Sequence, residues 1–97
     1  MSKAWPLTPL AEVLTERQEV PNHVDRSLFD RLRETRLRLA KDKGVPAYII
    51  CHDRTLLDMA ARRPTSMGAL AEVHGMGPAR IERYGESFLE TVNAHAP

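Results

Sequence analysis

The sequence predicts an all-α protein, a compact orthogonal bundle of about five short helices. Three observations indicate this fold class. Apolar residues recur at helical spacing in several segments, and glycine or proline separates one segment from the next. The one run that could pass for a strand, residues 45–51, has no second run with which to pair. Aromatic residues make up only 5% of the chain, so aliphatic side chains must fill most of the core, as helical bundles allow.

Residues 1–24 differ from the rest of the 97-residue chain because prolines punctuate them. Thr8 is placed to cap a short helix, with a proline at its first position and aliphatic side chains on one face. We interpret residues 1–24 as a linker or tail that contains this one candidate helix. Residues 25–95 then form a single helical domain, which is long enough for one modest core.

A long helix is expected over about residues 26–43, with Gly44 as its C-cap. Ser27 and Asp30 resemble a capping pair at its start, and Asp25 is the alternative cap. Its apolar face is made by residues at helical spacing: Leu28, Leu32, Thr35 and Leu39. This helix is the main candidate for the centre of the core.

Shorter elements are expected in the second half of the chain. In order, they are a buried turn or single helical turn at residues 45–51, a helix from Asp53 as its cap to about residue 63, a short helix capped by Thr65 or Ser66 and ending near residue 73, and helices at 78–84 and 86–94. Gly85 is expected to break the chain between the last two.

The most informative motif is the glycine turn at residues 73–78. Gly75 and Gly77 lack a Cβ, so the backbone can adopt positive φ and approach another chain closely. The following proline is suited to the first position of a helix, whose free N–H groups can bind an anion. Arg80 and Arg83 lie on that helix. The pattern is typical of a helix-hairpin-helix element that binds phosphates, although the same glycines could simply pack two helices closely.

Charge and cysteine content limit the classes of partner. The formal net charge is +1, so nucleic acid would have to bind a local basic patch, weakly and with strong dependence on salt. Cys51 is the only cysteine, which excludes an intrachain disulfide and is typical of a reducing cytoplasm. No apolar run is long enough to span a bilayer, and the start of the chain lacks the apolar segment of a signal peptide. We therefore expect no membrane partner.

The sequence contains no pattern that predicts catalysis. The four histidines are scattered, without the spacing of metal ligands. Cys51 and His52 are neighbours, but adjacent side chains diverge, and a catalytic Cys–His pair is normally brought together by the fold. Asp53 is explained as a helix cap, so it does not indicate a carboxylate pair with Asp58. We expect no metal, no cofactor and no enzymatic activity in this chain.

Several motifs follow one another along residues 25–95. They are Leu28-Phe29 with Leu32-Arg33, Gly44-Val45-Pro46-Ala47-Tyr48-Ile49-Ile50, Asp53-x-x-Leu56-x-x-Met59-Ala60 with Pro64, Leu70-x-x-Val73-x-Gly75-Met76-Gly77, Ile81-x-x-Tyr84-Gly85 and Phe88-Leu89. In this order they closely resemble the HRDC domain, the helicase and RNase D C-terminal domain of RecQ-family DNA helicases and RNase D. The resemblance is strongest to bacterial RecQ proteins and leaves residues 1–24 outside.

The resemblance implies an auxiliary domain that binds single-stranded or branched DNA weakly, without sequence specificity, and directs a helicase motor to its substrate. The motor is not in this sequence, because no Gly-x-x-x-x-Gly-Lys-Ser/Thr run is present to hold the phosphates of ATP. The motor domains of the same polypeptide are then the expected protein partner, and the domain itself is expected to be a monomer. The expected location is the bacterial cytoplasm, in association with the nucleoid.

Two surfaces compete as the nucleic-acid site. The first is formed by Lys41, Lys43, Tyr48 and Arg54. The resemblance implies that Tyr48, the aromatic after the Val-Pro-x step, lies in an electropositive patch that binds single-stranded DNA. A tyrosine ring can stack on a base while cations hold phosphates, a mode worth roughly 1–3 kcal/mol per base. From the residues alone, a Tyr48 packed in the core beside two isoleucines is equally compatible.

The second surface is the glycine turn, with Gly75, Gly77, Arg80 and Arg83. Most arginines of the long helix interleave with acidic residues and are interpreted as a solvated face with i,i+4 pairs. Arg33 is the exception that we retain as a candidate contact. Arg36 falls toward the apolar face and is interpreted as a snorkelling or salt-bridged side chain.

Three functions remain open at this point. The first is the DNA-binding accessory domain of a RecQ-like helicase. The second is an RNase D-type domain that positions structured RNA. The third is a protein-interaction module whose basic surface is incidental, which the near-neutral net charge allows.

Overall fold

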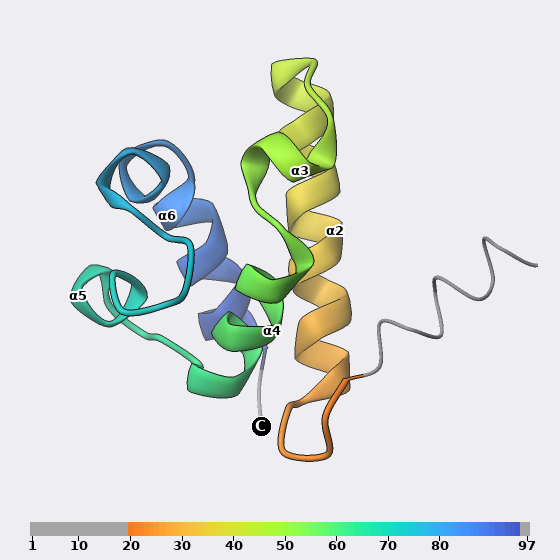
Figure 1. Cartoon of the computed structure of the whole chain (residues 1–97), viewed down its shortest axis with the longest axis vertical. Helices are drawn as coiled ribbons and strands as arrows, with labels where there is room; N and C mark the ends of the chain where they lie inside the picture. Colours follow the sequence, from red (N-terminus) through yellow and green to blue (C-terminus); the bar gives the residue numbers. More distant parts are fainter. Residues whose placement is uncertain (1–19, 96–97) are drawn as a thin grey trace, which may run out of the picture.

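The computed structural model describes residues 20–95, and all the regular elements in this range are helices. They are α2 (Arg26–Lys43), α3 (Ala47–Ile50), α4 (Asp53–Arg62), α5 (Met67–Leu70) and α6 (Pro78–Ala94). Helix α2 packs against α3, α4 and α6, and α5 packs against α6. Figure 1 shows α2 as the longest element, with α3 and α4 following each other along it. The predicted all-α fold class is confirmed, while the candidate helix after Thr8 lies outside the described residues.

The start of α2 is capped by Asp25, the alternative that the sequence left open. Its carboxylate accepts hydrogen bonds from the backbone N–H groups of Ser27 at 3.0 Å and Leu28 at 3.2 Å. Hydrogen bonds from Ser27 and from the Leu28 N–H lower the pKa of Asp25 to about 2. At the other end, Gly44 has a φ of 68° and donates its N–H to carbonyls of the last turn, as predicted for a C-cap.

The core lies where α2, α4 and α6 meet, and the short helices close it. Its largest fully buried side chains are Phe29, Phe88, Leu28, Leu32, Ile50, Leu56, Met59, Leu70 and Cys51. Aliphatic residues therefore dominate, with one phenylalanine from each of the two long helices. Val24 is also buried in this cluster and Val20 packs against it, so residues just before α2 contribute to the core.

The expected break at Gly85 is wrong, because α6 is continuous from Pro78 to Ala94. A Cβ at Gly85 would lie 3.2 Å from the sulfur of Met67 and 3.3 Å from a methyl carbon of Leu70. The glycine therefore allows α5 to pack closely on α6 while its own backbone stays helical. Glycine inside a helix costs about 1 kcal/mol relative to alanine, and this packing offsets the cost.

Two further expectations about helix ends need correction. The N-cap of α4 is His52, which makes no side-chain capping bond, and Asp53 is the first residue of the helix. Ser66 caps α5 by accepting the N–H of Ala69 at 3.1 Å, as predicted, but α5 ends at Leu70 instead of near residue 73. Turns follow α5, in which the N–H groups of Glu72, Val73 and Met76 bond to carbonyls three residues earlier.

A candidate nucleic-acid interface

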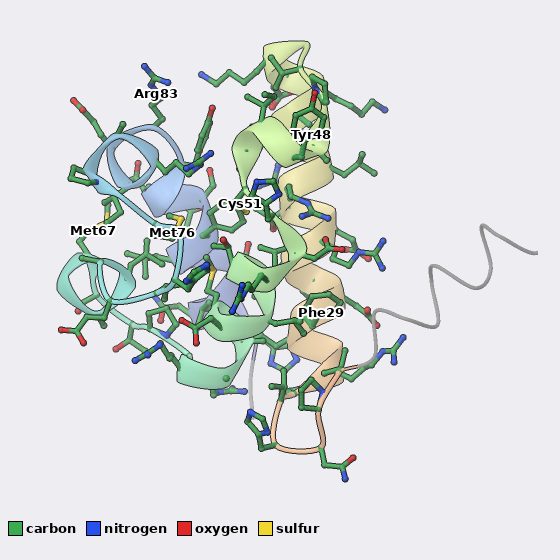
Figure 2. The ribbon with its side chains drawn as sticks, in the orientation of Figure 1. Phe29, Tyr48, Cys51, Met67, Met76 and Arg83 are labelled. Carbon is green, nitrogen blue, oxygen red and sulfur yellow. The ribbon has the colours of Figure 1, made fainter. Side chains whose placement is uncertain are left out.

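The connector after α2 presents Tyr48 to solvent. The single helical turn α3 begins after Pro46, and its last residue, Ile50, is completely buried. Tyr48 and Ile49 lie on the outside of the turn, with 59% and 44% of their surfaces exposed. Figure 2 shows Tyr48 beside α2 and α3. Ile50 thus supplies the core contact, and a Tyr48 packed in the core is not what the structure shows.

Tyr48 lines a surface groove together with Arg54, a residue of the first turn of α4. The other residues of this groove, which we call the Tyr48 groove, are Arg36, Ala47, His52 and Asp53. Two members of the first predicted surface, the aromatic ring and one cation, therefore line the same groove. One groove therefore carries an exposed aromatic ring and a guanidinium, groups that can stack on a base and pair with a phosphate.

An ion pair fixes one side of the Tyr48 groove. Arg36 donates to the Asp53 carboxylate at 2.7 Å and to the Cys51 carbonyl at 3.0 Å, and only 9% of its surface is exposed. These bonds attach α2 to the segment that joins α3 and α4 and to the first residue of α4. The interpretation of Arg36 as a salt-bridged side chain is confirmed. Its partner is Asp53, which forms this ion pair and does not cap α4.

Arg54 has a different electrostatic environment from that of Arg36. Within residues 20–95 no carboxylate forms an ion pair with Arg54, whereas the neighbouring Asp53 is neutralised by Arg36. The positive charge on this side of the groove therefore belongs to Arg54. His52 and Asp53 were not predicted as groove residues, and the only indication in the sequence was the interpretation of Arg36 as an ion-pair partner.

The two lysines of the first predicted surface lie in the last turn of α2 and are exposed. Lys43 places its Nζ 6.0 Å from the centre of the Tyr84 ring, within the range of a cation–π contact. Neither lysine lines the Tyr48 groove. Lys41 and Lys43 add positive charge at the end of α2 from which the chain continues to α3.

The glycine turn is used mainly for packing. Gly75 has a φ of 82°, and a Cβ at this position would collide with the hydroxyl of Thr55 on α4. Gly77 has an ordinary φ of −78° as the N-cap of α6, and a Cβ there would meet nothing within 4 Å. Gly75 is thus required for the close approach of the turn to α4, which is the alternative interpretation of the motif. The helix-hairpin-helix element itself stays a prediction.

The arginines after the turn have separate positions. Arg80 donates through Nε to the Ile50 carbonyl at 2.8 Å, and this bond joins α6 to the end of α3. Arg83 is exposed, and Figure 2 shows it at the outer edge of α6. On α2, the guanidinium of Arg33 lies 5.8 Å from the centre of the Phe29 ring and lines a neighbouring groove with Leu37 and Ala47. These arginines do not converge on one site.

The turn is further anchored by Asp58 of α4. Its carboxylate accepts the backbone N–H of His74 at 2.8 Å and the Nε–H of Arg62 at 2.9 Å. Burial opposes the charged form of Asp58, but these two hydrogen bonds prevail and lower its pKa below the ordinary value. The backbone just before Gly75 is therefore attached to α4 by a charge-assisted bond.

The described residues give little support for other chemistry. Burial raises the pKa of the Cys51 thiol to about 11, so its sulfur stays protonated at neutral pH and is a poor nucleophile. No three histidine, cysteine or acidic side chains gather as metal ligands within residues 20–95. In the same range, no helix has the length and apolar character needed to cross a membrane.

Comparison with known proteins identifies the family. The HRDC domain model matches residues 25–92. The ATP-dependent DNA helicase RecQ of Haemophilus influenzae is 38% identical over 80 residues, which are 82% of this chain and 13% of that protein. RecQ of Bacillus subtilis is 33% identical over 86 residues, or 89% of this chain and 13% of that protein. The ATP-dependent DNA helicase UvrD2 of Mycobacterium tuberculosis is 35% identical over 85 residues, or 88% of this chain and 12% of that protein.

A solved structure supports the same conclusion. HRDC domain 3 of D. radiodurans RecQ superposes with a TM-score of 0.68 at 43% sequence identity, covering 69% of this chain and 88% of that one. The chain thus spans the greater part of a solved HRDC domain but only 12–13% of the length of the helicases compared above. The family match over residues 25–92 and this structural likeness agree, and the chain belongs to the HRDC domain family.

Proposed function

We propose that this chain is the accessory nucleic-acid-binding domain of a RecQ-like DNA helicase, and that it binds single-stranded or branched DNA weakly and without sequence specificity. The observation that carries the proposal is the exposed ring of Tyr48 in a groove with Arg54. The RecQ and UvrD2 proteins that the chain resembles are both described as ATP-dependent DNA helicases, which supports a helicase as the parent protein.

The chemistry of the Tyr48 groove suits a single strand. A base can stack on the phenol ring, and the Arg54 guanidinium can pair with the adjacent phosphate. Neither contact reads the edge of a base, so binding should tolerate any sequence. Because the net charge of the chain is only +1, the electrostatic contribution is local, and affinity should fall as salt is added, with a slope set by the few cations at the groove.

Weak binding is sufficient for an accessory domain. A domain tethered to a motor raises the local concentration of the motor on DNA to the millimolar range for short linkers. The motor domains of the same polypeptide are the partner that this role requires. On this proposal the domain carries no catalytic residue, and ATP hydrolysis belongs to the rest of the protein.

Fluorescence anisotropy with a labelled oligothymidylate at low salt tests the proposal. Tyr48→Ala should weaken binding at least about fivefold, as expected for the loss of one stacked base, whereas Tyr48→Phe should retain most of the affinity. Ile49→Ala is the matched control, because Ile49 is also exposed on α3 but lines no part of the groove. Equal binding by the wild type and Tyr48→Ala would overturn the proposal. The same titration with an oligoribonucleotide tests the RNase D-type alternative.

A protein-interaction role is the second candidate, and one observation favours it. Leu37 is 57% exposed and lines the groove next to that of Tyr48, with Ala47 shared by both. Leu37 on α2 and Ile49 on α3 are thus exposed aliphatic side chains on neighbouring helices. Retention of a motor domain on the immobilised chain, lost in Leu37→Ser and unchanged in Tyr48→Phe, would favour this role.

A further inference from the structure

A second surface groove includes Arg54 and runs along α4. Its polar lining consists of Arg54, Asp58 and Arg62 from α4, His74 from the glycine turn and His23 from the segment before α2. Arg54 lines both this groove and the Tyr48 groove. The two grooves are therefore neighbours on the surface, with one guanidinium between them. We call the second one the histidine groove.

The charge of the histidine groove favours an anion. Its one carboxylate, Asp58, is already occupied by the Arg62 guanidinium and the His74 N–H. Arg54 has no carboxylate partner within residues 20–95 and supplies the uncompensated positive charge. His23 and His74 are exposed and offer ring N–H donors as well as flat faces. Imidazole and guanidinium groups are among those on which unpaired bases stack.

The groove is also held in a fixed shape. The Asp58–His74 bond attaches the glycine turn to α4, and the contact of Gly75 with Thr55 sets their separation. On the other side, Val24 is buried in the core and its N–H bonds to the Pro21 carbonyl at 2.9 Å, which positions the segment with His23. Contacts held by a rigid frame cost less ordering entropy on binding than contacts from mobile loops.

We propose that a single strand seated in the Tyr48 groove continues past Arg54 into the histidine groove, where its phosphates and bases contact His23 and His74. This inference rests on the proposed function, because it extends the path of the same strand. On this proposal the glycine turn contacts the strand through the side chain of His74. Gly77 and Arg83 take no part in binding. It also predicts that the domain occupies a longer segment of DNA than one stacked base.

The test compares oligothymidylates of about 5 and about 15 nucleotides, lengths near the lower and upper ends of common single-strand site sizes. In NMR titrations of the labelled chain at low salt, both should shift the resonances of Ala47, Tyr48 and Arg54. Only the longer one should also shift those of His23 and His74. Anisotropy then measures the affinity for each length in His74→Glu and His23→Glu. Asn93→Glu, an exposed site on α6 that lines neither groove, controls for the added charge.

We expect His74→Glu and His23→Glu each to weaken binding of the longer strand by about threefold or more and to leave the shorter one nearly unchanged, as loss of a local phosphate contact predicts. Asn93→Glu should alter neither by as much. If Tyr48 shifts with both lengths but the histidines do not, and the glutamate variants bind like Asn93→Glu, the histidine groove is excluded while the proposed function stands. If neither oligonucleotide shifts Tyr48, both proposals fail.

Discussion

The α3 connector and the glycine turn compete as nucleic-acid surfaces in the sequence, yet the structure uses their residues differently. In the turn, Gly75 is placed against Thr55, and the His74 N–H is taken by Asp58. In the connector, Ile50 fills the core, while Tyr48 remains exposed beside Arg54. The comparison teaches that a glycine as suggestive as Gly75 can be explained by packing. The exposed Tyr48 ring, in a groove with an arginine that has no carboxylate partner among residues 20–95, has no such packing role.

The largest expected effect tests the packing role of the turn. Gly75→Ala should destabilise the fold by about 2–4 kcal/mol, because alanine disfavours positive φ and its Cβ would displace Thr55. Gly77→Ala should cost about 1 kcal/mol or less, as expected for a changed N-cap with open space around it. Urea unfolding followed by circular dichroism measures both. Equal losses in the two variants would contradict the assignment of separate roles to the two glycines.

The next effect concerns the ion pair beside the Tyr48 groove. Arg36→Met leaves the Asp53 carboxylate and the Cys51 carbonyl without their donor, so it should cost about 1–3 kcal/mol, the partial exposure of Asp53 reducing the loss. Asp53→Asn should cost less and should strengthen binding of single-stranded DNA, because it removes the one negative charge of the groove. Urea unfolding and anisotropy measure the two effects. Weaker DNA binding by Asp53→Asn would show that the charge of the groove is not what attracts the strand.

The next prediction concerns the pH dependence of stability, and it involves Asp58, which anchors the glycine turn, and Asp25, which caps α2. The pKa of Asp25 is lowered to about 2 from 3.8, and that of Asp58 is lowered as well. Interactions that lower a carboxylate pKa stabilise the folded state at pH values above the pKa of the unfolded state, near 3.8. This stabilisation is lost as the pH falls toward the lowered pKa of the folded state. Asp25→Asn and Asp58→Asn should therefore each flatten the loss of stability on acidification below about pH 4.

Urea midpoints measured at a series of pH values test this expectation. Asp30→Asn is the control, since within residues 20–95 its carboxylate makes only an exposed contact of 4.0 Å with Arg26. If both Asp25→Asn and Asp58→Asn lose stability in acid as the wild type does, neither carboxylate makes the hydrogen bonds that the structure indicates.

The smallest expected effect is on DNA affinity, and it compares Arg54 at the Tyr48 groove with Arg83 on the helix after the glycine turn. Arg54→Ala should weaken binding of single-stranded DNA a few-fold and reduce the slope of log affinity against log salt by about 1. Arg83→Ala removes the same charge from the outer edge of α6 and should change the affinity less than about twofold. A salt series of anisotropy titrations measures both slopes. A larger loss in Arg83→Ala than in Arg54→Ala would assign the binding to the turn.

Local sequence signals predicted the helical framework well. The span of α2, its glycine C-cap, the single turn at α3 and the Ser66 cap are determined by residues close together in the chain, and the structure has them as expected. Glycine at position 85 was misinterpreted for a physical reason. Its low helix propensity indicates a break, but the need for space beneath Met67 and Leu70 is a tertiary property.

The candidate site was only partly predictable for a similar reason. Asp53 resembled a cap, and its actual partner, Arg36, lies on another helix and is brought to it only by the packing of α4 on α2. In a four-residue helix, the pattern of Tyr48, Ile49 and Ile50 does not determine which side chain faces the core. The histidine groove was not predictable at all, because its residues come from three separate segments of the chain.

The measurement that tests the central claim most directly is an NMR titration of the labelled chain with a short oligothymidylate at low salt. Perturbed resonances should cluster at Ala47, Tyr48 and Arg54, and the perturbation should fade in Tyr48→Ala. Perturbations confined to residues 75–83, and unchanged by Tyr48→Ala, would contradict the account and assign nucleic-acid binding to the glycine turn.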